Sequence, residues 1–368
     1  MKKNSTGNRG STAGMRKQQH VTIGMDLGDK SSRLCALGTQ GEVLFERTIA
    51  TTKKGMAQVF GALARWRVAL EVGSHSPWVS RWLARFGQEV IVANARQLQL
   101  ITHSTRKGDR LDAHTLARLA RIDPELLRPI RHRSEDVQSD LARIRVRAAL
   151  VETRTALVNT ARGLAKAAGE RLPKCATDYL TVDELEPLPA GLRSVLQPLL
   201  QQIETLTEQI QACDQQLEQI ARSQYPETEL LRQVSGVGTL IALTFVLTLE
   251  DPQRFAKSRQ VGCYVGLRPK RRDSGQSQPQ LGISKEGDRY LRTLLVQGAH
   301  CILKQRGPDT DLKRWGLRLA ARGGKNARKR AVVAVARKLA VLLHKLWTTG
   351  EVYEPLRQAQ AQANCNAA

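Results

Sequence analysis

Aromatic side chains, paired cysteines and long apolar runs are all scarce in this chain of 368 residues. Phe, Trp and Tyr together make up 4% of it, which disfavours a protein that stacks nucleic-acid bases on aromatic rings. The six cysteines form no Cys-x-x-Cys pair, and the seven histidines show no metal-ligand spacing. Reduced thiols are therefore expected, and neither a disulfide framework nor a zinc site is predicted.

No stretch stays apolar for long enough to cross a bilayer. The longest run, near Gly238–Leu249, falls short of the roughly 20 residues that a membrane span requires. Residues 1–20 carry five Lys or Arg and no acid, but they lack the apolar centre of a signal peptide. They are interpreted as a basic, disordered tail. We expect a cytoplasmic protein without a membrane partner.

Acidic residues are outnumbered by basic ones. The 58 Lys and Arg oppose 34 Asp and Glu, and the formal net charge is +24. Such an excess suits a polyanionic partner, nucleic acid before membrane, that is bound through its phosphates in a salt-dependent manner. The candidate phosphate contacts are Lys107, Arg110, Lys270, Arg271, Arg272, Lys285, Arg289, Lys325, Arg328, Lys329 and Arg330.

Residues 21–133 predict an α/β fold with a mixed sheet. Three antiparallel strands are expected first, and helices then alternate with further strands. The expected strands are Val21–Leu27, Ser32–Gly38, Glu42–Ile49, Arg67–Val72 and Glu89–Ala93, and the expected helices are Lys54–Trp66 and Pro77–Phe86. A final helix opens within Lys107-Gly108-Asp109-Arg110-Leu111-Asp112-Ala113.

Four acids of this region are placed where a site could form. Asp26 lies in the middle of the first strand and Glu71 at the end of a later one, and such positions line the functional crevice of open α/β sheets. Asp109 and Asp112 project from one face of the final helix. Acids this close repel unless a divalent cation lies between them, so Mg²⁺ is expected. The alternative is that the two helix acids merely favour the helix dipole. Nearby Asp29 is interpreted as a turn residue.

From Ser134 the pattern changes to long helices, and residues 134–225 are expected to form a helical linker. Apolar residues recur at alternating spacings of four and three from Leu199 to Ile220, as in a coiled-coil seam. Prolines between Gly169 and Gly191 allow the helices to fold back as an antiparallel hairpin. The seam fits a contact between protomers and a plain bundle within one chain equally well.

Residues 226–350 predict a mostly helical C-terminal domain, followed by a flexible tail over residues 351–368. Gly236 and Gly238 form a Gly-x-Gly turn that resembles the helix-hairpin-helix element, whose backbone N–H groups hold a DNA phosphate. A simple tight turn explains the same pattern nearly as well.

Ser274 stands at a Ser-Gly turn directly after Lys270, Arg271 and Arg272. These cations could hold a phosphodiester beside the hydroxyl and stabilise the negative charge that develops as it is attacked. By itself the pattern does not separate a nucleophile from an ordinary loop serine.

In their order and spacing, these motifs resemble the DEDD insertion-sequence transposases of the insertion-sequence 110 type, a family related to the Piv DNA invertases. The resemblance runs from about Val21 to Trp347. The matching motifs are Gly24-Met25-Asp26, Leu70-Glu71, Lys107–Ala113, Ser235–Gly238, Gly266-Leu267-x-Pro269, Asp273-Ser274-Gly275 and Ile283-Ser284-Lys285-x-Gly287. The chain departs from the pattern over Val72–Ser76, where many relatives have Ala-Thr-Gly and an aromatic residue, and in its basic N-terminal extension.

The resemblance implies a RuvC-like (ribonuclease-H-fold) N-terminal domain, an antiparallel coiled coil and a C-terminal transposase domain. It implies that Asp26, Glu71, Asp109 and Asp112 are the DEDD carboxylates, which bind one or two Mg²⁺, and that Ser274 is a nucleophile that attacks DNA. Relatives recombine donor and target DNA as tetramers, guided by a structured non-coding bridge RNA. Donor and target DNA, such an RNA, a homo-oligomer (dimer or tetramer) and a place at the bacterial nucleoid are therefore expected.

Three other functions compete with this interpretation. A RuvC-like nuclease or resolvase would use the same carboxylates with water as the attacking group. A sugar-kinase or actin-like ATPase shares the Asp26-Leu27-Gly28 pattern, but the chain shows no second glycine-rich phosphate loop with an acid, and +24 is a poor charge for it. A non-catalytic nucleic-acid-binding relative would keep only the basic surfaces.

Overall fold

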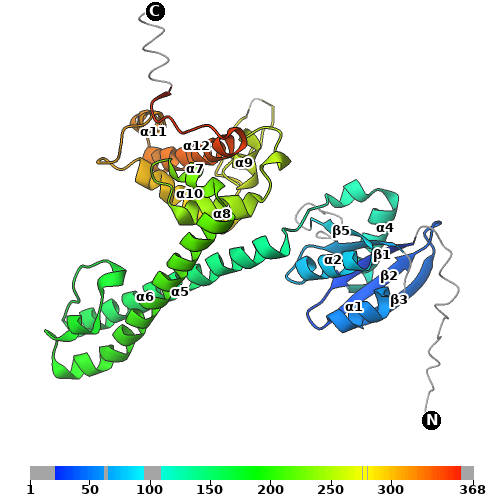
Figure 1. Ribbon diagram of the computed structural model, residues 1–368, viewed down its shortest axis with the longest axis horizontal. Coiled ribbons are helices and arrows are strands. Elements are labelled where there is room, and N and C mark those ends of the chain that lie inside the picture. Colours follow the sequence, from blue (N-terminus) through cyan, green and yellow to red (C-terminus); the bar gives the residue numbers. More distant parts are fainter. Residues whose placement is uncertain (1–20, 62–64, 95–108, 276, 280, 358–368) are drawn as a thin grey trace, which may run out of the picture. The chain divides into compact units, whose positions relative to one another are not determined.

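The computed structural model describes residues 21–61, 65–94, 109–275, 277–279 and 281–357 (Figure 1). The chain divides into two compact units, Met1–Arg133 and Ser134–Ala368, called here unit 1 and unit 2. The expected basic tail, the residues after Arg357 and the candidate Lys107 lie outside the described residues. Within the described ranges, no helix combines the length and the apolar character that a membrane crossing would need.

Unit 1 is built on a mixed sheet of five strands in the order β3-β2-β1-β4-β5. The strands are β1 (Thr22–Leu27), β2 (Ser31–Leu37), β3 (Val43–Ala50), β4 (Arg67–Glu71) and β5 (Glu89–Ala93). The helices are α1 (Lys53–Phe60), α2 (Ser76–Arg85) and α4 (Asp109–Ile122), with a 3-10 turn over Pro124–Leu127. The first three strands pair antiparallel, and β4 and β5 run parallel to β1. The predicted mixed sheet is confirmed.

Alternating residues of the central strands face two different helix layers, because successive side chains of a strand point to opposite sides. Ile23 and Met25 of β1 are fully buried in a core with Met56 and Phe60 of α1 and with Leu83 of α2. On the other face of the sheet, α4 supplies the cover. Its apolar side chains pack against β4, β5 and β2 in two smaller clusters, through Leu116 and Ala120 in one and Ala113 and Ala117 in the other.

Gly24 lets α4 lie directly on the central strand. A Cβ atom built at Gly24 would stand 1.9 Å from the carbonyl oxygen of Ala113 and 2.5 Å from the backbone nitrogen of Ala117. No side chain fits at that distance, so only glycine permits this approach of helix to strand. The contact fixes how the first turns of α4 lie over the end of β1.

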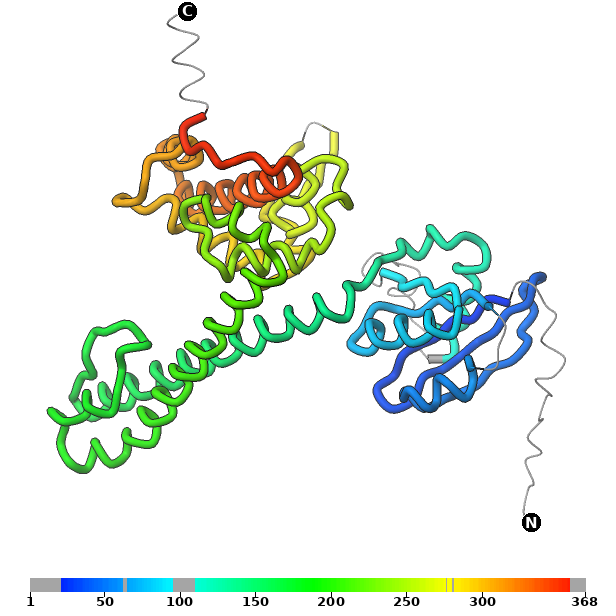
Figure 2. Tube along the Cα trace, in the orientation of Figure 1, coloured from blue at the N-terminus to red at the C-terminus, as the bar shows by residue number. Residues whose placement is uncertain are grey.

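Unit 2 begins with two long helices that lie side by side, α5 (Glu135–Ala167) and α6 (Ala190–Gln224) (Figures 1 and 2). Figure 2 shows the chain leaving along α5 and returning along α6. The connecting segment carries two 3-10 turns, Thr177–Tyr179 and Val182–Leu185, and buries Leu180 and Leu185 against both helices. The antiparallel helical hairpin predicted from the prolines is present, and Pro198 lies inside α6.

The rest of unit 2 is a helical core. Its helices are α7 (Glu227–Arg232), α8 (Thr239–Leu249), α9 (Arg259–Tyr264), α10 (Arg289–Ile302), α11 (Asp311–Ala321) and α12 (Ala327–Thr349), with a 3-10 turn over Pro252–Arg254. α8 is buried from Ile241 to Leu249, and α10 and α12 pack around it through Leu295, Leu339 and Leu343.

Two expectations from the sequence need correction. Asp26 was expected in the middle of its strand, but β1 ends at Leu27 and leaves Asp26 next to its end. Residues 351–357, assigned to a flexible tail, pack on the helical core instead. The N–H of Asp311 donates to the carbonyl of Pro355 at 2.8 Å, and Tyr353 packs partly buried against the apolar cluster, so burial of its ring holds this segment in place.

Candidate active site

Asp26 and Glu71 lie next to each other at the carboxyl end of two parallel strands. Met25 pairs with Leu70 in the register of β1 and β4, so the next residue of each strand brings the two acids side by side. Two positions before each acid, the strand has a residue that contacts α4. These residues are Gly24 and Ala69, so the period of two turns both acids toward the helix that opens with Asp109 and Asp112.

Asp112 lies close enough to Glu71 for its negative charge to affect the pKa of the Glu71 carboxyl group. The pKa of Glu71 is raised, first by burial of its carboxyl group and then by the negative charge of Asp112. Asp112 directly precedes Ala113, whose carbonyl oxygen lies against Gly24, so the helix-to-strand contact explains the proximity. Asp109 is the first residue of α4, but its side chain lies outside the described residues.

The donor chemistry of these acids suits a hard divalent cation. Carboxylate oxygens are the ligands that Mg²⁺ prefers. A cation between Glu71 and Asp112 would relieve the repulsion that, after burial, raises the Glu71 pKa. Among the described residues, no group of three or more acids, histidines and cysteines is close enough to hold a metal. Glu71 and Asp112 are therefore the best supported pair, and the wider ligand set is a proposal.

The candidate phosphate contact Arg110 is engaged by an acid of the sheet. Its Nε donates to Glu46 Oε1 at 2.9 Å, and Arg33 Nη2 donates to Glu46 Oε2 at 3.2 Å. The hydrogen bond from Arg110 lowers the pKa of Glu46. The Arg110 side chain nevertheless remains 75% exposed, so a phosphate could reach it at the cost of this surface pair.

Ser274 stands at the tip of an irregular hairpin in unit 2. At the stem, the N–H of Lys270 donates to Gly282 O at 2.9 Å. At the tip, Ser274 and Ser277 exchange two backbone hydrogen bonds of 3.1 and 3.0 Å, and Gly275 turns the chain with a φ of +56°. Ser274 is exposed. The three cations before it, Lys270, Arg271 and Arg272, are exposed as well.

The base of this hairpin is tightly packed. A Cβ at Gly266 would stand 2.1 Å from Glu286 O, and one at Gly287 would stand 1.9 Å from Tyr264 O. Arg292 of α10 donates to the carbonyls of Val265 and Glu286, at 3.1 and 2.9 Å. Its guanidinium thus holds both sides of the hairpin base, a role that the sequence did not reveal.

The Gly-x-Gly turn has a packing role as well as a candidate binding role. Gly236 has a φ of +84°, and a Cβ there would stand 2.9 Å from the carbonyl oxygen of Gly298 in α10. Gly238 directly precedes α8 and has open space around it. The hydroxyl of Thr239, the first residue of α8, donates to the carboxylate of Glu218 in α6.

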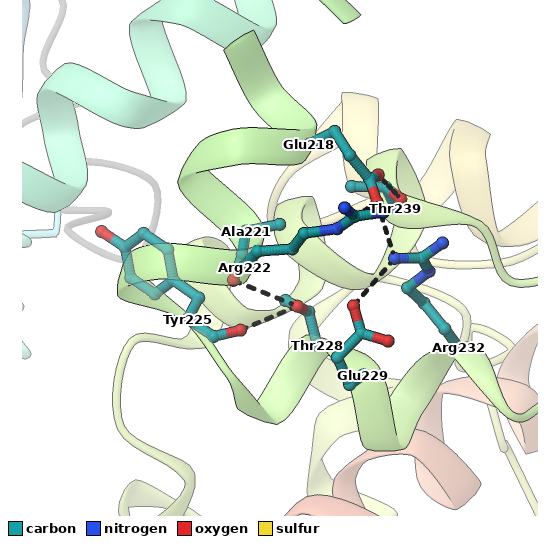
Figure 3. Close-up of polar contacts among 8 residues, drawn as sticks. All are labelled: Glu218, Ala221, Arg222, Tyr225, Thr228, Glu229, Arg232 and Thr239. Carbon is teal, nitrogen blue, oxygen red and sulfur yellow. Dashed lines mark hydrogen bonds and ion pairs between the residues drawn. The ribbon is translucent and has the colours of Figure 1, made fainter. Parts of the chain in front are cut away.

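Glu218 collects donors from three helices (Figure 3). Besides Thr239 of α8, Arg222 of α6 and Arg232 of α7 donate to it, at 3.0 and 2.9 Å. The hydrogen bond from Thr239 is the largest cause that lowers the pKa of Glu218, and Arg232 adds to it. An ionised acid at the start of α8 opposes a phosphate there, so the contacts favour a structural junction at this turn.

The remaining candidate cations gather in exposed positions of unit 2. Asn326 precedes α12 with a φ of +67°, and the first turn of that helix contains no acid. Its apolar residues Val335 and Leu339 are fully buried. The exposed cations are Lys285, Arg289, Lys325, Arg328, Lys329 and Arg330. Lys285 holds a φ of +58°, which is uncommon for a residue with a side chain.

Comparison with protein families gives two matches along the chain. Residues 23–168 match the model of a DEDD transposase of the IS110 type. Residues 228–313 match the model of the transposase IS116/IS110/IS902 family. Together the matches span more than half of the chain, and they include Asp26, Glu71, Asp112 and Ser274.

Curated relatives are similar over most of their length. The transposase for insertion sequence element IS1111A of Coxiella burnetii is 28% identical over 341 residues, 90% of this chain and 90% of that protein. The probable family 20 transposase of Pseudomonas aeruginosa is 28% identical over 90% of this chain and 98% of its own. The transposase for insertion sequence element IS1328 of Yersinia enterocolitica is 27% identical, with the same coverage.

Proposed function

The chain belongs to the IS116/IS110/IS902 family of insertion-sequence transposases, and on this premise we propose that it cuts and rejoins DNA through a serine-linked intermediate. Unit 1 would be the RuvC-like catalytic domain, with Asp26, Glu71, Asp109 and Asp112 as its carboxylates. Residues 226–350 would form the transposase domain that carries Ser274. The observation that supports the catalytic role most directly is the pair of partly buried acids, Glu71 and Asp112, whose charges repel.

The chemistry divides between the two sets of residues. Bound Mg²⁺ would supply charge stabilisation at the scissile phosphate, and the four carboxylates would hold it. The Ser274 hydroxyl attacks the phosphorus and forms an Oγ–P bond while the bond to the leaving DNA oxygen breaks. The hydroxyl proton passes to solvent, and the leaving oxygen takes up a proton to become a free DNA hydroxyl. Lys270, Arg271 and Arg272 orient the phosphate and stabilise its charge. A free DNA hydroxyl then attacks the phosphoserine, which restores Ser274 and joins the new strand.

The partners follow from the charge and from the family. The net charge of +24 and the exposed cations of α12 support binding of donor and target DNA and of a structured guide RNA through their phosphates. We propose a homo-oligomer in which unit 1 of one protomer acts with Ser274 of another. The outer faces of the α5 and α6 hairpin are the candidate contact between protomers, because the seam residues Ile203, Leu206 and Ile210 are already buried within one chain.

A covalent-adduct experiment tests the nucleophile. The full chain is incubated with Mg²⁺ and labelled donor DNA from the ends of its own element, and the products are separated on denaturing gels. We expect a labelled band at protein size that is lost in Ser274→Ala and retained in Ser277→Ala. Ser277 is the matched control because it is an exposed serine of the same hairpin, and its contacts to Ser274 are made by backbone atoms.

The same gels distinguish the alternative mechanism. Cleaved DNA without an adduct, unaffected by Ser274→Ala, would identify water as the nucleophile and a RuvC-like nuclease. Asp112→Asn should abolish Mg²⁺-dependent cleavage in either case, since both mechanisms depend on the carboxylates. Binding of DNA without cleavage by the wild-type chain would point to a non-catalytic relative.

A further inference from the structure

His75 connects the two loops that follow Asp26 and Glu71. Its Nε2 lies 3.2 Å from Oδ1 of Asp29, in the turn between β1 and β2. Its other ring nitrogen, Nδ1, accepts a hydrogen bond of 3.0 Å from the indole N–H of Trp78 in α2. His75 belongs to the segment in which the sequence departs from the pattern of its relatives, and Asp29 was interpreted only as a turn residue.

Trp78 determines which nitrogen of His75 carries the proton. An indole N–H can only donate, so Nδ1 must be unprotonated to accept from it. The neutral ring then carries its proton on Nε2, which can donate to Asp29. The two rings meet edge to face with centroids 6.1 Å apart, which holds the imidazole in this orientation. His75 is therefore a donor directed across the gap between the two loops.

Both loops are also anchored elsewhere, so the His75 contact joins two held segments. At the end of the loop after β4, the hydroxyl of buried Ser76 donates to Gly73 O at 2.8 Å and lies 2.9 Å from Nε2 of His132, outside the loop. In the turn after β1, Thr51 Oγ1 donates to Gly28 O at 2.9 Å. A link between such segments resists their separation better than a link between free loops.

We propose that His75 is a positioning residue of the carboxylate site, which limits the separation of Asp26 and Glu71 by joining the loops that follow them. This inference rests on the proposed function of these acids. Neighbouring carboxylates repel when no cation lies between them, so a cross-loop hydrogen bond from His75 to Asp29 opposes their separation. Groups that hydrogen-bond directly to metal ligands commonly change metal affinity by 10- to 100-fold when removed. His75 acts on the ligands only through their loops, so its effect is expected at the lower end of that range.

Two substitutions separate the hydrogen bonds of His75. His75→Gln places an amide N–H where Nε2 was and keeps the donor to Asp29, but it loses the acceptor for Trp78. His75→Asn places an oxygen where Nδ1 was and keeps that acceptor, but it cannot reach Asp29. Glu89→Ala is the control for stability, because it removes an exposed ion pair with Arg67 (3.0 Å) at the opposite end of β4.

The readout is the melting temperature of the full-length chain, without DNA, as a function of MnCl₂ concentration. We expect His75→Asn to raise the half-saturating Mn²⁺ concentration about tenfold and His75→Gln to leave it within about threefold. Glu89→Ala should leave it unchanged, whatever its effect on the melting temperature itself. Donor-DNA cleavage by His75→Asn should recover when Mn²⁺ is raised by the same factor.

Four outcomes would overturn the proposal. An unchanged half-saturating concentration in His75→Asn would leave His75 with a purely structural role, and equal behaviour of the Asn and Gln variants would remove Asp29 from the argument. If Glu71→Gln abolishes the Mn²⁺ response while His75→Asn does not affect it, the metal site stands and the His75 proposal fails alone. A wild-type chain without any Mn²⁺ response would overturn both.

Discussion

Gly24→Ala should separate α4 from the sheet and so test whether this contact builds the site. The added Cβ would stand 1.9 Å from Ala113 O, whereas ordinary contacts begin at 3.4 Å. The helix must therefore withdraw by about 1.5 Å. Neither Ala113 O nor Ala117 N can rotate away, because both are backbone atoms of α4. Asp112 moves with the helix.

The cost can be estimated from this geometry. Overpacking in a well-packed core costs about 1–3 kcal/mol, and a clash with immobile backbone belongs near 3 kcal/mol. For a domain of this size, each kcal/mol shifts the melting temperature by roughly 4 °C. Gly24→Ala should therefore lower the melting temperature of unit 1 by about 12 °C. A displacement near 1 Å at the site can also reduce a catalytic rate by about 100-fold.

Thermal unfolding followed by circular dichroism measures the first effect, and Mg²⁺-dependent cleavage measures the second. Gly73→Ala is the matched control: it lies in the same unit, and a Cβ there meets nothing within 4 Å. It should shift the melting temperature by less than about 2 °C, in line with ordinary surface substitutions. If Gly24→Ala melts at the same temperature as the wild type, α4 does not lie on β1 as described and the explanation for the site is wrong.

Three further substitutions have expected outcomes. The pKa of Glu71 is raised in the folded chain, so its contribution to stability is present below its unfolded pKa and is lost as pH rises through the folded pKa. Glu71→Gln should therefore raise the metal-free melting temperature at pH 7 and leave it unchanged at pH 3. Glu218 has a lowered pKa, so its contribution is present above the unfolded pKa and lost as pH falls; Glu218→Gln should lower the melting temperature at pH 7, with the difference shrinking toward pH 3. The double variant Lys329→Ala and Arg330→Ala should reduce the slope of log affinity against log salt concentration for duplex DNA by about 1.8. Lys345→Ala is the control and should not change this slope, because the Lys345 ammonium lies 3.7 Å from the Glu351 carboxylate.

The strands were predictable from sequence because each carries a local pattern. Alternating apolar residues around Asp26 and the short apolar run before Glu71 identify β1 and β4, and the glycines between the early strands identify turns. The spacing of Asp109 and Asp112 likewise fixes both on one helix face. These features depend on neighbours in the chain, and local periodicity is what a sequence reports directly.

The contacts that assemble the site were not predictable, because their partners are far apart in sequence. Nothing local marks Gly24 as the place where α4 lies on the sheet, since a strand glycine indicates only a close approach of unknown origin. His75 and Asp29 are separated by 46 residues, and each has an ordinary interpretation in its own loop. Residues 351–357 read as a tail because their order depends on burial of Tyr353 against distant helices.

Two described contacts hold the repelling acids together without a cation between them. Gly24 lets α4 approach the strand because it has no side chain. His75 joins the loops through a hydrogen bond from its neutral ring to the Asp29 carboxylate. A site built in this way keeps its carboxylates close before any cation arrives, so the repulsion is released on binding. Variants should therefore fall into two classes, which change the melting temperature of the metal-free chain in opposite directions. Glu71→Gln should stabilise the metal-free chain and abolish the Mn²⁺ response. Gly24→Ala should destabilise the metal-free chain and weaken the response, because the acids move apart. A loose group of surface acids would show neither pattern, since removing one of its charges changes little in either state.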